Sequence, residues 1–94
     1  MTNYKEINLL VEKHQVGDVD ATALLLKQFN KLLLRVATKY HKKEPTLTMV
    51  DLYQHGVYVF LLLCKKYDPR KKVNFVGYIK QYFEHVYTDK MMEI

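Results

Sequence analysis

Apolar residues recur every three or four positions along most of the chain, the period of helices with one buried face. Gly17 and the segment around Pro45 interrupt this pattern, because glycine commonly ends helices and proline disfavours their interior. Asp18 and Thr48 follow these breaks and can cap the next helix with a side-chain oxygen. We expect an all-α fold, a compact bundle of about four helices at about 3–16 (capped by Thr2 or Asn3), 18–40, 48–67 and 74–90.

The third expected helix has two different faces when its residues are placed at about 100 degrees each. One face is apolar and centres on Gly56, where glycine costs about 1 kcal/mol relative to alanine and favours close approach of another helix. The opposite face is polar at its start and apolar further on; its members are Asp51, Gln54, His55, Tyr58 and Leu62. By periodicity alone, this outward face fits either a protein-docking surface or incidental exposure.

The second expected helix directs a broad apolar face toward the core, but Leu24 and Leu34 fall among lysines on its other side. We expect these two leucines to be partly exposed. In the fourth expected helix, Phe75, Tyr78 and Tyr82 lie on one stripe. Aromatic residues at this spacing are typical of a core.

The length of 94 residues suits one domain, residues 1–94. The longest apolar run, Val57–Cys64, is shorter than the roughly 20 residues that span a membrane, and the N-terminus does not resemble a signal peptide. A single cysteine cannot form an internal disulfide, which agrees with a reducing compartment. We therefore expect a cytoplasmic protein without membrane contact.

The chemistry of catalysis is poorly represented in the sequence. It contains no phosphate-binding glycine loop, no nucleophile motif and no cysteine pair, and its four histidines lack the spacing of metal ligands on one helical face. We expect neither enzyme activity, nor a metal, nor a cofactor.

The net charge of +5 is concentrated in two clusters near expected helix ends: Lys39, Lys42 and Lys43, and then Lys65, Lys66, Arg70, Lys71 and Lys72. Cations there fit solvated helix ends as well as a nucleic-acid patch. The second cluster is followed at once by the aromatic stripe, and cations beside aromatic side chains can hold single-stranded nucleic acid. The candidate nucleic-acid residues are Lys66, Arg70, Lys71, Lys72, Phe75, Tyr78 and Tyr82. Burial of the aromatic residues in the core is the competing interpretation.

The segment DLYQHGVYVFLLLCKKYDPRKKVNFVGYIKQYF, Asp51–Phe83, resembles the second region of bacterial sigma factors of the housekeeping type. That region reads approximately DLIQEG, an apolar helix, KYDP or a close variant, a basic turn, and F-x-x-Y-A. Upstream, GDVDATALLLKQFNKLLLRVATKY is similar to the preceding helices of the family. Together, the resemblance covers most of the chain.

The resemblance implies that Asp51 and Gln54 make polar contacts to the clamp helices of the largest RNA polymerase subunit. It also implies that Phe75 and Tyr78 belong to the element that captures unstacked bases of the minus-ten promoter region. His55 stands where the family usually has Glu. The two tryptophans that follow in the family are replaced by Gln81 and Tyr82.

Glu84 stands where the family has arginine. Compared with the family, we expect the helix that reads the promoter duplex to be hardly present and the region that recognises the minus-thirty-five element to be absent. We therefore expect a sigma-like or co-sigma transcription factor that binds polymerase core and needs a second sigma-like protein for promoter recognition. Leu24 and Leu34, or the first helix, are candidates for that second contact. The alternatives are a DNA-binding regulator of a phage or mobile element, and a sigma mimic that inhibits polymerase.

Overall fold

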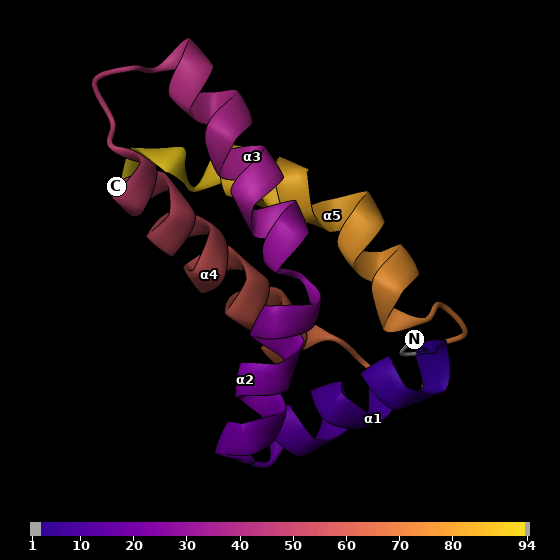
Figure 1. The fold of residues 1–94 in the computed structure, drawn as a ribbon. Coiled ribbons are helices and arrows are strands. Elements are labelled where there is room, and N and C mark those ends of the chain that lie inside the picture. Colours follow the sequence, from indigo (N-terminus) through magenta and orange to yellow (C-terminus); the bar gives the residue numbers. More distant parts are fainter. Residues whose placement is uncertain (1–2, 94) are drawn as a thin grey trace.

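The computed structural model describes residues 3–93, which form five α-helices and one short 3-10 helix joined by turns (Figure 1). The predicted all-α class is confirmed, since these residues contain no strand. The predicted number of about four helices is wrong. The elements are α1 (Tyr4–Gln15), α2 (Val19–Gln28), α3 (Asn30–Lys43), α4 (Met49–Lys66), α5 (Phe75–Asp89) and the 3-10 helix η1 (Met91–Glu93).

The additional helix arises from a break at Phe29, inside the segment expected to form one helix. Phe29 has φ −101° and ψ 10°, outside the helical range, and it separates α2 from α3. Its ring packs against Phe60 and Phe75, with centroid distances of 5.0 and 5.7 Å. The break therefore lets α2 pack on α1 while α3 packs on α4. The sequence has no glycine or proline at this point, so the apolar periodicity did not predict a break in the helix.

Side-chain oxygens cap four of the helices, which explains why the chain forms helices at these positions. Each cap satisfies a backbone N–H group that has no partner within the helix. The pairs are Asn3 with Glu6 at 2.9 Å, Asp18 with Ala21 at 3.1 Å, Thr48 with Asp51 at 3.0 Å and Asn74 with Gly77 at 2.8 Å. The caps predicted at Asn3, Asp18 and Thr48 are thus confirmed, whereas Thr2 lies outside the described residues.

Helix α4 packs against α1, α3 and α5 and is the longest helix of the fold (Figure 1). Its buried residues are Leu52, His55, Gly56, Val59, Phe60, Leu63 and Cys64. Buried side chains from the surrounding helices, among them Leu33, Phe75 and Phe83, complete one continuous core. The described part of the chain leaves no fully buried side-chain nitrogen or oxygen without a hydrogen-bond partner. The side of α4 that carries Asp51, Gln54 and Tyr58 is not covered and remains at the surface.

Gly56 is the point of close approach that the sequence predicted on α4. A Cβ atom at this position would lie 3.5 Å from Leu33 Cδ2, 3.5 Å from Tyr87 Cε2 and 3.8 Å from Phe83 Cζ. These are ordinary van der Waals distances. The neighbouring helices therefore do converge on Gly56, but they leave space for a methyl group.

We predict that Gly56→Ala raises the free energy of unfolding by about 1 kcal/mol, because alanine is the better helix former and its methyl group fills space in the core. Urea unfolding followed by far-UV circular dichroism measures this change. Gly17→Ala is the contrasting variant: Gly17 has φ +95°, so a Cβ atom there should lower stability by about 1 kcal/mol. A destabilised Gly56→Ala variant would contradict the geometry.

Candidate functional site

The surface strip of α4 carries most of the predicted polymerase-binding residues. Asp51, Gln54 and Tyr58 are exposed, and Leu62 is half-buried. Their spacing of three, four and four residues places them in one row along the helix. Tyr58 is 46% exposed, which is high for a large aromatic side chain. The row thus changes from polar at the start of α4 to apolar toward its end.

His55 does not belong to this row, and its predicted outward position is wrong. The side chain is 7% exposed, and its Nε2–H group donates a hydrogen bond to the Tyr87 carbonyl oxygen at 2.9 Å. In return, the Tyr87 hydroxyl donates to the Leu52 carbonyl oxygen at 2.9 Å. Burial raises the pKa of Tyr87 to about 12, which keeps this hydroxyl a donor. His55 therefore ties α4 to the last turn of α5.

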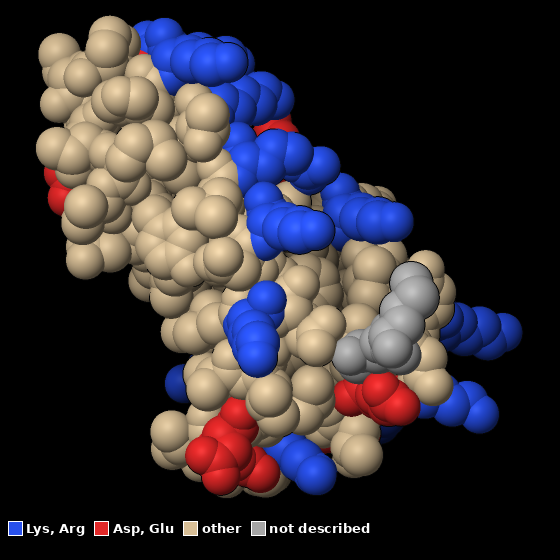
Figure 2. All heavy atoms as spheres, in the orientation of Figure 1, with Lys and Arg blue, Asp and Glu red and all other residues tan. Residues whose placement is uncertain are grey.

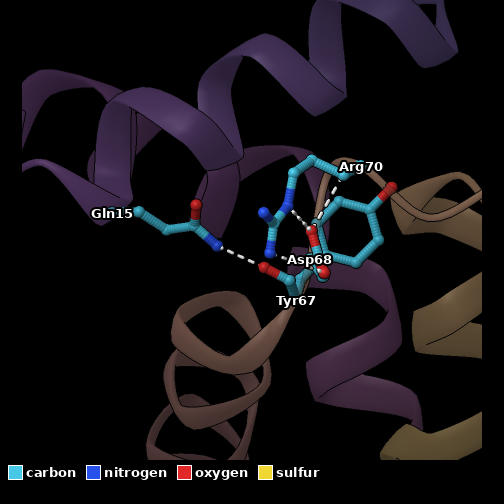
Figure 3. A network of polar contacts seen from close by, with 4 residues as sticks. All are labelled: Gln15, Tyr67, Asp68 and Arg70. Carbon is cyan, nitrogen blue, oxygen red and sulfur yellow. Dashed lines mark hydrogen bonds and ion pairs between the residues drawn. The ribbon is translucent and has the colours of Figure 1, made fainter.

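The basic turn between α4 and α5 is folded around Asp68 (Figure 3). The Asp68 carboxylate accepts hydrogen bonds from Arg70, from the backbone N–H at 2.9 Å and from Nε–H at 3.1 Å. These bonds hold the pKa of Asp68 below its usual range, so Asp68 offsets the charge of Arg70 at neutral pH. All four predicted nucleic-acid cations remain exposed: Lys66 at the end of α4, and Arg70, Lys71 and Lys72 in the turn.

Helix α1 holds both ends of this turn. Gln15 Nε2 donates to the carbonyl oxygens of Cys64 at 2.9 Å and Tyr67 at 2.7 Å, where α4 ends (Figure 3). Asn8 Oδ1 accepts from the Phe75 N–H group at 3.0 Å, where α5 begins. The sequence analysis missed Asn8 and Gln15. Their partners are backbone groups 49 to 67 residues away, and no local pattern marks such a contact.

A hollow of about 220 Å³ lies beside the turn, between the end of α4 and the start of α5. Its lining includes two cations, one acid and two exposed or half-buried tyrosines: Lys66, Lys71, Asp68, Tyr78 and Tyr82. The two tyrosine rings lie 5.2 Å apart at 55°, and Tyr82 is 41% exposed. Cations and aromatic side chains therefore do meet at one place, as the sequence predicted.

Phe75 is not part of this hollow, and its prediction as a base-stacking residue is wrong. The side chain is fully buried and packs edge-on against Phe29, Phe60 and Tyr67, with centroid distances of 5.3 to 5.9 Å. Tyr78 is half-buried, and desolvation raises its pKa. Burial of the aromatic stripe, the competing interpretation, thus holds for Phe75, while Tyr82 reaches the surface.

Glu84 turns away from this hollow and forms an ion pair with Lys39 of α3. Both side chains are about half exposed. The pair joins α3 to α5, and a second bond between the hydroxyl groups of Tyr40 and Thr88, 2.6 Å apart, lies one turn further along. The negative charge of Glu84 is therefore paired within the protein.

The remaining chemistry is limited. Cys64 is buried, and desolvation raises the pKa of its thiol to about 12, so it is protonated and unreactive at neutral pH. In residues 3–93 no three histidine, cysteine or acidic side chains are grouped as metal ligands would be. None of the helices described here is long and apolar enough to cross a membrane.

Comparison with known proteins identifies no relative: no family model, no curated protein and no solved structure matches the chain. The resemblance to sigma region 2 therefore rests on the motifs and spacing in the sequence.

We predict that Gln15→Ala lowers the free energy of unfolding by about 1 to 3 kcal/mol, because two carbonyl oxygens at the end of α4 lose their donor. Urea unfolding provides the measurement. Gln28→Ala is the matched control, since Gln28 is exposed at the end of α2. Equal stability of the two variants would show that Gln15 does not hold the turn.

Proposed function

We propose that the protein is a sigma-like or co-sigma transcription factor of the cytoplasm that docks on the clamp helices of RNA polymerase core. The observation that carries this proposal is the exposed row on α4, with Asp51 and Gln54 at its polar end. The motif DL-x-Q-x-G at the start of this helix and the YDP and F-x-x-Y motifs after it are the basis of the resemblance. A second sigma-like protein supplies promoter recognition.

The physical character of the row supports a protein partner. From Asp51 to Leu62 the helix rises by eleven residues, so the row is about 16 Å long, a length that suits contact with another helix. Tyr58 offers a large amphipathic side chain near its centre, and Leu62 extends the apolar end. The surface therefore combines polar groups for orientation with an apolar area for affinity.

Contact with the second protein is proposed for another part of the surface. Leu24 and Leu34 are 47% and 44% exposed, as their positions on the polar side of the helix predicted. Leu34 lies among the cations of α3, whereas Leu24 lies on α2 next to α1. We favour Leu24 and the exposed Leu9 of α1 for this contact.

We predict that Asp51→Ala combined with Gln54→Ala weakens binding to purified RNA polymerase core by about 30-fold or more, because the partner groups lose their polar contacts. Binding is measured by biolayer interferometry, and circular dichroism checks that the helices remain. The matched control is Asp20→Ala with Gln28→Ala, which also removes one exposed acid from a first helical turn and one exposed amide.

Two results would contradict the proposal: no polymerase binding by the unaltered protein, or the same loss in both double variants. Transcription assays with core polymerase distinguish activator from inhibitor. A protein that binds the clamp but lowers transcription in every combination with its partner is a sigma mimic.

A second candidate function, nucleic-acid binding, is favoured by the hollow between Lys66, Lys71 and Tyr82. An exposed aromatic ring next to lysines can stack on a base while the cations contact phosphates. Single-stranded promoter DNA in the minus-ten region is the ligand that the sigma-like proposal implies. A DNA-binding regulator of a phage or mobile element would use the same hollow without polymerase.

We predict that Tyr82→Ala with Lys71→Ala weakens binding to single-stranded DNA by about tenfold or more, since both stacking and a phosphate contact are lost. Fluorescence anisotropy with a labelled oligonucleotide measures the change. Tyr4→Ala with Lys5→Ala, an exposed pair on α1, is the control. If DNA affinity is unaltered by the first pair of substitutions, the hollow is not a binding site.

A further inference from the structure

The charge of the protein is distributed very unevenly. Helix α3 carries five cations and no acid: Lys31, Arg35, Lys39, Lys42 and Lys43. The other ten cations of the chain are balanced by its ten acids, so the net charge of +5 equals the charge of this one helix. We call these five residues the α3 cationic row.

The row forms a continuous surface rather than a scatter of charges. Its members follow one another by four, four, three and one residues, which keeps them on one side of the helix. All five side chains are exposed, and together with Leu34 and Thr38 they line one shallow, open hollow. Figure 2 shows blue side chains following the line of α3, with little red between them.

Neighbouring elements leave most of this charge unpaired. Lys80 of α5 shares a second hollow with Lys31 and Arg35. Among the groups that face the row, Glu84 pairs with Lys39, and Glu44 follows the end of α3. Lys31, Arg35, Lys42 and Lys43 have no acidic partner in an ion pair between the described residues.

We propose that the α3 cationic row binds the phosphate backbone of duplex DNA, at a surface separate from the α4 row and from the Tyr82 hollow. From Lys31 to Lys43 the helix rises by twelve residues, so the row is about 18 Å long, the length of about five base pairs of duplex DNA. Like charges held this close repel one another, and a dense polyanion relieves that repulsion by replacing its own counterions with the lysine and arginine groups.

The side chains of the row favour a duplex over a single strand. Single strands are usually held by aromatic rings that stack on bases. Among the residues of α3, all of which the structure describes, Tyr40 is the single Phe, Tyr or Trp, and its side chain is half-buried. Phosphate contacts carry no sequence information by themselves. The row therefore binds duplexes of unrelated sequence with similar affinity.

An anionic membrane fits the same surface less well. A helix that inserts into the interface buries an apolar face in lipid. The apolar face of α3, including Leu33, Val36 and Ala37, is already buried against the core. Leu34 is the large apolar side chain that the row offers outward, and one such residue contributes little insertion.

The test uses the triple variant Lys31→Gln, Arg35→Gln and Lys42→Gln, which leaves the Lys39–Glu84 ion pair in place. The matched control is Lys5→Gln, Lys13→Gln and Lys27→Gln, three exposed cations on α1 and α2. Both variants have the same net charge. Anisotropy with two unrelated 20-base-pair duplexes is measured over a range of salt concentrations.

We expect the row variant to bind both duplexes about tenfold or more weakly, and its slope of log affinity against log salt to fall by about 2 to 3. The control should stay close to the unaltered protein. If the row variant is not folded by circular dichroism, Arg35→Gln compared with Lys27→Gln provides the same test, with a slope change of about 0.9.

Several results would overturn the inference. They are equal loss in both triple variants, absence of duplex binding by the unaltered protein at low salt, and retained duplex binding by the row variant through the Tyr82 hollow. The inference would also be overturned if the row bound anionic lipid vesicles or polyglutamate but did not bind duplex DNA. None of these outcomes depends on whether the protein binds polymerase.

Discussion

The burial of α4 on three sides constrains every other part of the molecule. Contact with α1, α3 and α5 uses both flanks of the helix, including Gly56 at the place where Leu33 and Tyr87 approach most closely. What remains is a surface strip that includes Asp51, Gln54 and Tyr58, and its side chains are free to contact a partner because the core does not need them. The outward row and the core are therefore two consequences of one packing arrangement.

Helical periodicity and cap chemistry were sufficient to predict most of the fold. The caps form hydrogen bonds with N–H groups only three residues away, so the local sequence is sufficient to predict them at Asn3, Asp18 and Thr48. The break at Phe29 was not predictable in this way. It is imposed by the aromatic contacts of Phe29 with α4 and α5, which exist only after the chain has folded.

The candidate site was predictable to a similar extent. Asp51, Gln54 and Tyr58 lie outward as their spacing indicates, because position on a helix is a local property. His55 and Phe75 were misplaced because a neighbouring helix covers one and an aromatic cluster surrounds the other. The distribution of charge was only partly predictable. The sequence indicated a cluster of Lys39, Lys42 and Lys43 near a helix end, whereas the structure shows that Lys31 and Arg35 extend this cluster along α3.

The two anchors from α1 give the basic turn a property beyond its charge. Gln15 fixes its first residue, Asn8 fixes the start of the helix that follows, and the Tyr67 hydroxyl donates to the Val73 carbonyl oxygen at 2.7 Å across it. A free loop must lose conformational entropy when it grips a ligand, at a cost of about 1 to 2 kcal/mol for each residue that becomes ordered. In this turn that loss occurs during folding, so a ligand meets a preorganised surface.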